Sequence, residues 1–100
     1  MKRDPLETIR KLDSEFCDSI SRAAAEAFED GALSAKVKYL IAMALDAAHG
    51  AAGGVASLGR QAMEHGASRE EIIEALHVAN YVSGVGAVYT ASFGLADVLG

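Results

Sequence analysis

Few side chains in this 100-residue sequence are of the types that perform acid–base chemistry near neutral pH. The strongest candidates are Tyr39 and the histidines His49, His65 and His77. Because a histidine titrates close to neutrality, His49 or His77 together with Tyr39 could supply the acid and the base of a lyase or isomerase. Tyr39 precedes His49 by ten residues, about 15 Å along a helix, so a direct pair within one protomer is not expected.

Each histidine also has a structural interpretation. His49 and His65 fall where helical patterns end, and a cation at that position suits the helix dipole. His77 lies next to Leu76 and four residues before Tyr81, as a hydrogen-bonded core or interface histidine would. The three histidines show no spacing typical of a metal site, so neither a metal nor another cofactor is predicted.

Cys17 is the only cysteine, so the chain forms no internal disulfide and a reducing compartment is expected. Residues 1–10 lack the apolar segment of a signal peptide, and we predict a cytoplasmic location. We interpret Cys17 as a helix-packing residue rather than a nucleophile.

Charge and hydropathy exclude two classes of partner and favour a third. The net charge of −5 argues against nucleic acid, which binds clustered Lys and Arg. Residues 80–100 carry one charge, Asp97, but Gly84 and Gly86 interrupt them, so a buried helix is predicted and not a membrane span. Because 51% of so short a chain is apolar, we expect it to form a homo-oligomer that covers part of this surface.

The elements that position these residues are all predicted to be helices, about five in number. Apolar residues recur every three or four positions, and the strong helix former alanine dominates. The predicted helices cover residues 5–31, 35–49, 51–65, 69–83 and 87–99. The motif "DPLE" at 4–7 is expected to cap the first helix and Gly31 to end it, while Ser34 and "SREE" at 68–71 cap two others. The last helix is apolar nearly all round and should lie at the centre.

A small-residue segment lies between the second and third helices. In residues 47–59, ten of thirteen are Gly, Ala or Ser. A glycine costs about 1 kcal/mol relative to alanine in a helix interior, and close approach of a neighbouring helix usually compensates for it. Gly50 and Gly54, four residues apart, would share one helical face and allow such a crossing.

Three motifs flank or follow this segment: "GALSAKVKYLIAMALDAA", "HGASREEIIEAL" and "SGVGAVYTAS". Together, over residues 31–99, they resemble the carboxymuconolactone decarboxylase family, and within it the alkylhydroperoxidase D-like proteins. The length of 100 residues predicts a single domain, 1–100, and the resemblance makes it a domain of this family. The resemblance also implies an all-α fold built on an antiparallel helical hairpin, and assembly into trimers or hexamers.

The resemblance further implies a thiol peroxidase site, whose residues this chain lacks. Redox members of the family have a Cys-x-x-Cys pair, a His four residues after it and a Glu on the preceding helix. These positions correspond here to Ala51, Gly54, Leu58 and Tyr39, so the peroxidase activity of the family is not expected. The decarboxylase branch keeps the His that is Leu58 here, so its chemistry does not map onto the chain either.

Three hypotheses therefore remain open, and whether the chain is an enzyme is not decided by its sequence. The first is a homo-oligomer that binds a small apolar or planar molecule where the thiols would have been. The second is a lyase, isomerase or decarboxylase acting on a lactone-like carboxylated substrate through His and Tyr. The third is a structural scaffold, in a mixed assembly with an active relative. The candidate pocket residues are Tyr39, His49, Ala51, Gly54, Leu58 and His77.

Overall fold

The chain is built from helices alone: the computed structural model describes residues 4–100, and no strand occurs among them. The predicted all-α class is confirmed, with six helices in this part of the chain rather than about five. They are α1 (Glu7–Leu12), α2 (Ser14–Phe28), α3 (Ala35–Ala48), α4 (Ala52–Glu64), α5 (Arg69–Ser83) and α6 (Val85–Leu99).

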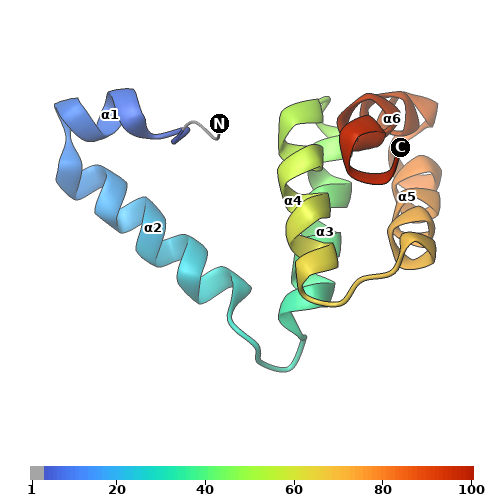
Figure 1. Ribbon diagram of the computed structural model, residues 1–100, viewed down its shortest axis with the longest axis horizontal. Coiled ribbons are helices and arrows are strands. Elements are labelled where there is room, and N and C mark those ends of the chain that lie inside the picture. Colours follow the sequence, from blue (N-terminus) through green and yellow to red (C-terminus); the bar gives the residue numbers. More distant parts are fainter. Residues whose placement is uncertain (1–3) are drawn as a thin grey trace.

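Helices α3 to α6 pack into one four-helix unit, which we call the body (Figure 1). α3 and α4 form an antiparallel hairpin, and α5 and α6 pack against it. Apolar side chains from all four helices meet between them, because each helix turns one apolar stripe inward. The buried core consists of Met43, Ala47, Val55, Ile72, Leu76, Ala79, Ala87, Ala91 and Leu95.

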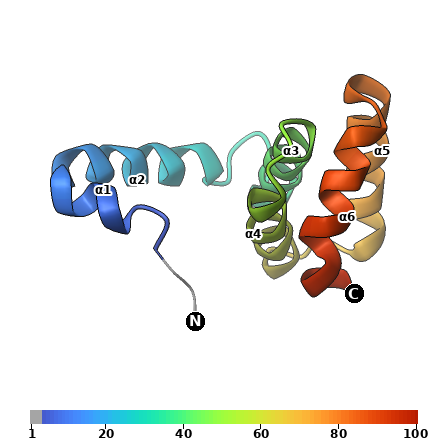
Figure 2. The same ribbon diagram turned by 90° about the horizontal axis from the view of Figure 1, so that it is seen from above.

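Helices α1 and α2 form a separate N-terminal arm, residues 4–28, that stands away from the body (Figures 1 and 2). The end of α2 makes the contact with the body, where it meets α3. Within the arm, α1 folds back on α2 and buries Cys17, whose Sγ lies 3.9 Å from the carbonyl oxygen of Leu6. Cys17 is therefore a packing residue, as the sequence indicated.

The predicted first helix, 5–31, was wrong because the helix breaks at Asp13. The non-helical backbone of Asp13 (φ −154°, ψ 86°) interrupts it, and the Asp13 carboxylate accepts a hydrogen bond from the Phe16 N–H (3.0 Å) to cap α2. The predicted cap at its start was also wrong. The Asp4 carboxylate accepts from the Leu6 N–H (2.9 Å), but α1 begins only at Glu7.

Glycines end the other helices, although not at Gly31. α2 stops three residues before Gly31, whose backbone is not left-handed. The left-handed glycines are Gly50, Gly66 and Gly84 (φ 77°, 99° and 88°), each following a helix. Gly84 alone separates α5 from α6, so α6 begins two residues earlier than predicted. No helix of residues 4–100 has the length and apolar character needed to cross a membrane.

The two predicted caps in the body are confirmed. The Ser34 hydroxyl accepts a hydrogen bond from the Val37 N–H (3.2 Å). Ser68 and Glu71 form a reciprocal capping box, with bonds of 3.1 and 2.9 Å. Glu71 also accepts a hydrogen bond from Lys36 (2.8 Å), which ties α5 to α3. The bonds from Lys36 and from the Ser68 N–H hold the pKa of Glu71 below its ordinary value of 4.5.

The close helix crossing that the glycines allow lies between α4 and α6. A Cβ added at Gly59 would lie 2.8 Å from Leu95 Cδ2, and one added at Gly94 would lie 3.0 Å from Val55 Cβ. The predicted crossing on Gly50 was wrong, because that residue lies in the α3–α4 turn and its Cβ would meet nothing within 4 Å.

The prediction that α6 lies at the centre was wrong for the single chain. α6 buries Ala87, Ala91 and Leu95 against the body. On the opposite face of α6, the side chain of Tyr89 is 62% exposed and that of Phe93 is 80% exposed. Helix α6 is apolar on all sides, but only one of its faces packs in the core, while the other lies on the surface of this chain.

Candidate functional site

Tyr39 on α3 is the centre of an aromatic cluster at the junction of the arm and the body. Its ring stacks on Phe28, the last residue of α2, with ring centroids 4.3 Å apart and planes 5° from parallel. On another side it lies 4.9 Å from the ring of His65, tilted by 35°. His65 ends α4, and its Nδ1 lies 2.9 Å from the carbonyl oxygen of Gln61. Residues from three helices therefore meet at Tyr39.

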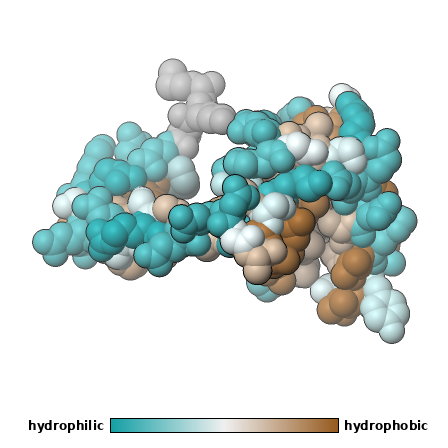
Figure 3. Space-filling model, turned by 90° about the horizontal axis from the view of Figure 1, so that it is seen from below, coloured by the Kyte–Doolittle hydropathy of each residue, from teal (hydrophilic) through white to brown (hydrophobic). Residues whose placement is uncertain are grey.

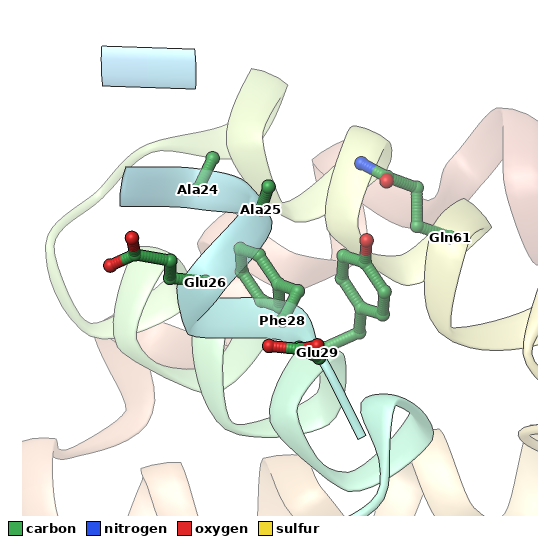
Figure 4. Close-up of a pocket in the computed structure, with 7 residues that line it drawn as sticks. Ala24, Ala25, Glu26, Phe28, Glu29 and Gln61 are labelled. Atoms are coloured by element: carbon green, nitrogen blue, oxygen red, sulfur yellow. The ribbon is translucent and has the colours of Figure 1, made fainter. Parts of the chain in front are cut away.

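An open cleft of about 530 Å³ lies beside this cluster. Figure 4 shows Phe28 and the carboxylate of Glu26 projecting from α2, that of Glu29 just after its end, and the Gln61 side chain on the α4 side. The aromatic rings give the cleft an apolar wall, and the carboxylates and the amide give it hydrogen-bonding groups. The lining residues are Ala24, Ala25, Glu26, Phe28, Glu29, Tyr39 and Gln61.

Asp46 is a residue of this region that the sequence analysis missed. Its carboxylate lies over Gly54: a Cβ added at Gly54 would meet Oδ2 and lie 2.8 Å from Cγ of Asp46. α4 begins at Ala52 without a side-chain cap, and a carboxylate beside its first turn is favoured by the helix dipole. One signal was available, because Asp46 is the only Asp, Glu, Lys or Arg in residues 39–59.

Tyr39 and Asp46 share one face of α3. They are seven residues apart, which is about two helical turns, so both point to the side of α3 on which α4 and the end of α2 pack. The cleft beside Tyr39 and the carboxylate over Gly54 thus lie on the same side of α3, about two helical turns apart.

The other predicted pocket residues lie apart from Tyr39 or carry no reactive group. Ala51 is the N-cap position of α4, and Leu58 packs against the core. His49 ends α3 and is exposed. His77 is exposed on α5, which excludes the core position and leaves the interface position as a prediction. The histidine that contacts Tyr39 is His65, for which the sequence predicts only a position at a helix end.

No cluster of three or more potential metal-binding side chains occurs within residues 4–100. What the arrangement offers is a planar aromatic surface, an amide and carboxylates at an open cleft.

The sequence profile of the carboxymuconolactone decarboxylase family matches residues 15–97. The chain belongs to this family. Its fold is similar to the crystal structure of apo-lpg0406, a carboxymuconolactone decarboxylase family protein from Legionella pneumophila, with a TM-score of 0.84 and 35% sequence identity. The match covers 91% of this chain and 81% of that protein. No curated protein sequence matches the chain.

Within the carboxymuconolactone decarboxylase family, the resemblance assigned a glutamate to the position of Tyr39 and a thiol to that of Gly54. The structure has an aromatic stack at the first position and the Asp46 carboxylate over the second. Neither the aromatic stack nor the carboxylate is a thiol able to reduce a peroxide.

Proposed function

We propose that this member of the carboxymuconolactone decarboxylase family binds a small planar molecule in the cleft beside Tyr39, as an assembly of several copies and without thiol peroxidase chemistry. The observation that carries the proposal is the Phe28–Tyr39–His65 cluster. It puts a planar apolar wall beside the cleft at the position where the resemblance assigned the glutamate of the redox members.

The cleft chemistry supports a planar ligand with hydrogen-bond donors or positive charge. Aromatic rings favour offset stacking with another π-system, which contributes about 0.5–1.5 kcal/mol beyond simple burial. Glu26 and Glu29 line the same cleft, so their carboxylates would attract a cation or accept hydrogen bonds from the ligand. The Gln61 side chain adds one amide that can donate or accept.

The position of the only thiol supports the absence of peroxidase chemistry. Cys17 is fully buried inside the arm, while a peroxidatic cysteine must be reached by peroxide. Ala51 and Gly54 have no nucleophilic side chain. A single buried cysteine and no disulfide also support the cytoplasmic location proposed from the sequence. The rings beside Tyr39 are those of Phe28 and His65, so no contact supports an acid–base pair of Tyr39 with His49 or His77.

The test uses a planar cationic dye of the acridine class, titrated against the full chain and followed by its fluorescence. We expect saturable binding that Tyr39→Ala weakens about tenfold, because the stacked aromatic wall that Tyr39 forms with Phe28 beside the cleft is lost. The matched control is Tyr89→Ala, which removes an exposed tyrosine on α6, away from the cleft, and should leave the affinity unchanged. Replacing Glu26 and Glu29 by Gln should reduce the dependence of binding on salt.

Two results would contradict the proposal. One is equal dye affinity in the Tyr39→Ala and Tyr89→Ala variants, which would place binding elsewhere. The other is peroxide consumption, with a dithiol reductant present, that exceeds the rate without protein and persists in a Cys17→Ala variant.

A further inference from the structure

A second concave surface lies between α3 and α5, on the body. This groove has a volume of about 340 Å³, and Ser83 is the one polar residue among those that line it. Its rim is formed by Ile41 and Leu45 of α3 and by Val78 and Val82 of α5, which are 46% to 75% exposed. Figure 3 shows apolar residues gathered in this way on one face of the body. Water covers these side chains in the single chain, at a cost in free energy.

The arm has unpartnered apolar side chains as well. Ile9 and Leu12 of α1 and Phe16 of α2 are 39%, 79% and 54% exposed. Ile9 and Leu12, three residues apart, share one face of α1, and Phe16 follows in the first turn of α2, directly after the break at Asp13. One chain thus carries both an apolar segment and an apolar groove without a partner.

The arm and the groove of one chain lie on opposite sides of α3. The arm meets α3 at Tyr39, through Phe28. With 3.6 residues per turn, the α3 residues that line the groove are centred about 170° around the helix from Tyr39. An arm seated as the structure has it therefore cannot also fill its own groove, so the segment that fills it must come from another copy.

The accessible surface agrees in size with such an interface. The chain exposes 6696 Å², whereas a compact protein of its mass exposes about 5,400 Å². The excess of about 1,300 Å² is more than the roughly 800 Å² that each partner buries in a standard interface. The radius of gyration is 14.2 Å, whereas a compact chain of this length has about 13 Å. Both values are large because the arm extends from the body.

We infer that the arm of one copy docks in the α3–α5 groove of a second copy through Leu12, Phe16 and Ile9. The surfaces that meet are different, so the copies exchange arms reciprocally or follow one another around a closed ring. This inference rests on the part of the proposed function that concerns assembly, and it names the two surfaces. It is independent of the ligand, because neither surface lines the cleft at Tyr39.

The first experiment measures mass by sedimentation equilibrium for the full chain and three variants. The unmodified chain should be larger than its monomer mass of 10.4 kDa. Leu12→Asp in the arm and Val82→Asp in the groove should each raise the dissociation constant at least tenfold, because each puts a charge into the apolar contact. The control is Phe93→Asp on α6, a residue as exposed as these two, which should leave the mass unchanged.

The second experiment identifies the surfaces directly, in a Cys17→Ala background and again with the buried Cys17 retained. A Leu12→Cys protein is mixed with a Val82→Cys protein and treated with a short bismaleimide. We expect cross-linked dimers that contain one chain of each kind, and none when Leu12→Cys is mixed with Phe93→Cys.

The outcomes separate this inference from the proposed function. A monomer at all concentrations would overturn both the arm contact and the proposed assembly. An oligomer in which Val82→Cys links only to itself, or Leu12→Cys links only to Phe93→Cys, would leave assembly standing and overturn the arm-in-groove contact. Loss of dye binding in Tyr39→Ala with intact 12–82 cross-links would support both proposals independently.

Discussion

Gly94 is the residue at which the packing of α6 on α4 can be tested most directly. A Cβ at this position would meet the carbonyl oxygen of Ala52 and would lie 3.0 Å and 3.2 Å from two atoms of Val55. The carbonyl belongs to the first turn of α4, and Val55 is fully buried, so neither group can move aside without shifting the helix. Gly94→Ala therefore forces α6 away from α4.

The net effect is the difference between two terms. Overpacking of a well-packed contact costs about 1–3 kcal/mol. Replacing glycine by alanine inside a helix returns up to about 1 kcal/mol through helix propensity and the unfolded chain. We therefore expect Gly94→Ala to lower the free energy of unfolding by about 1–2 kcal/mol. For a chain of this size, each kcal/mol lowers the Tm by roughly 4–8 °C.

The matched control is Gly53→Ala, two residues into α4, where an added Cβ meets nothing within 4 Å. This variant should be as stable as the parent chain or slightly more stable. Urea and thermal unfolding, followed by helical circular dichroism at one fixed protein concentration, measure both variants, since association would make the Tm depend on concentration. A Gly94→Ala protein at least as stable as Gly53→Ala would refute the close contact between α4 and α6.

Three further outcomes are expected from contacts within the body. Gly54→Ala should lower the free energy of unfolding less than Gly94→Ala does, because the Asp46 carboxylate can rotate away from the added methyl group. In a Gly54→Ala/Asp46→Ala double variant this loss should disappear, which a double-mutant cycle of unfolding free energies measures. Ser68→Ala should lower the unfolding free energy by about 1 kcal/mol in urea titrations, because the cap of α5 is lost. The pKa of Glu71 is lower in the folded state than its ordinary 4.5. The stability that the ionised Glu71 carboxylate adds to the fold is therefore fully present above pH 4.5 and is lost as the pH falls through the folded-state pKa. In Glu71→Gln, the acid limb of the stability–pH curve should accordingly be shallower, and an unchanged limb would contradict this.

The parts of the fold that local chemistry determines were predictable from the sequence. Ser34 and Ser68 cap their helices because a hydroxyl at that position satisfies a free N–H whatever packs nearby. Gly66 and Gly84 end helices because they adopt a left-handed backbone at no steric cost. The break at Asp13 was missed because apolar residues continue at the same spacing across it, so periodicity alone could not distinguish one long helix from two.

The site was predictable only in part, because its contacts join residues far apart in the sequence. The resemblance pointed to Tyr39, but nothing local indicated that Phe28 and His65 would lie against it. Those contacts depend on how the arm meets the body and where α4 ends. Asp46 could have been noticed as an isolated charge in an apolar helix, but its position over Gly54 follows only from the hairpin geometry.

The glycine-rich start of α4 combines packing with the loss of thiol chemistry. The Asp46 carboxylate occupies the space that a side chain at position 54 would need, so a cysteine there could not be accommodated without moving it. A carboxylate beside the same position would also oppose the thiolate that thiol chemistry requires, since like charges repel. Restoring thiols at positions 51 and 54 alone should therefore not restore peroxide reduction. Both cysteines and a neutral residue at position 46 are needed together, besides the Glu and the His of the redox members, whose positions Tyr39 and Leu58 occupy here.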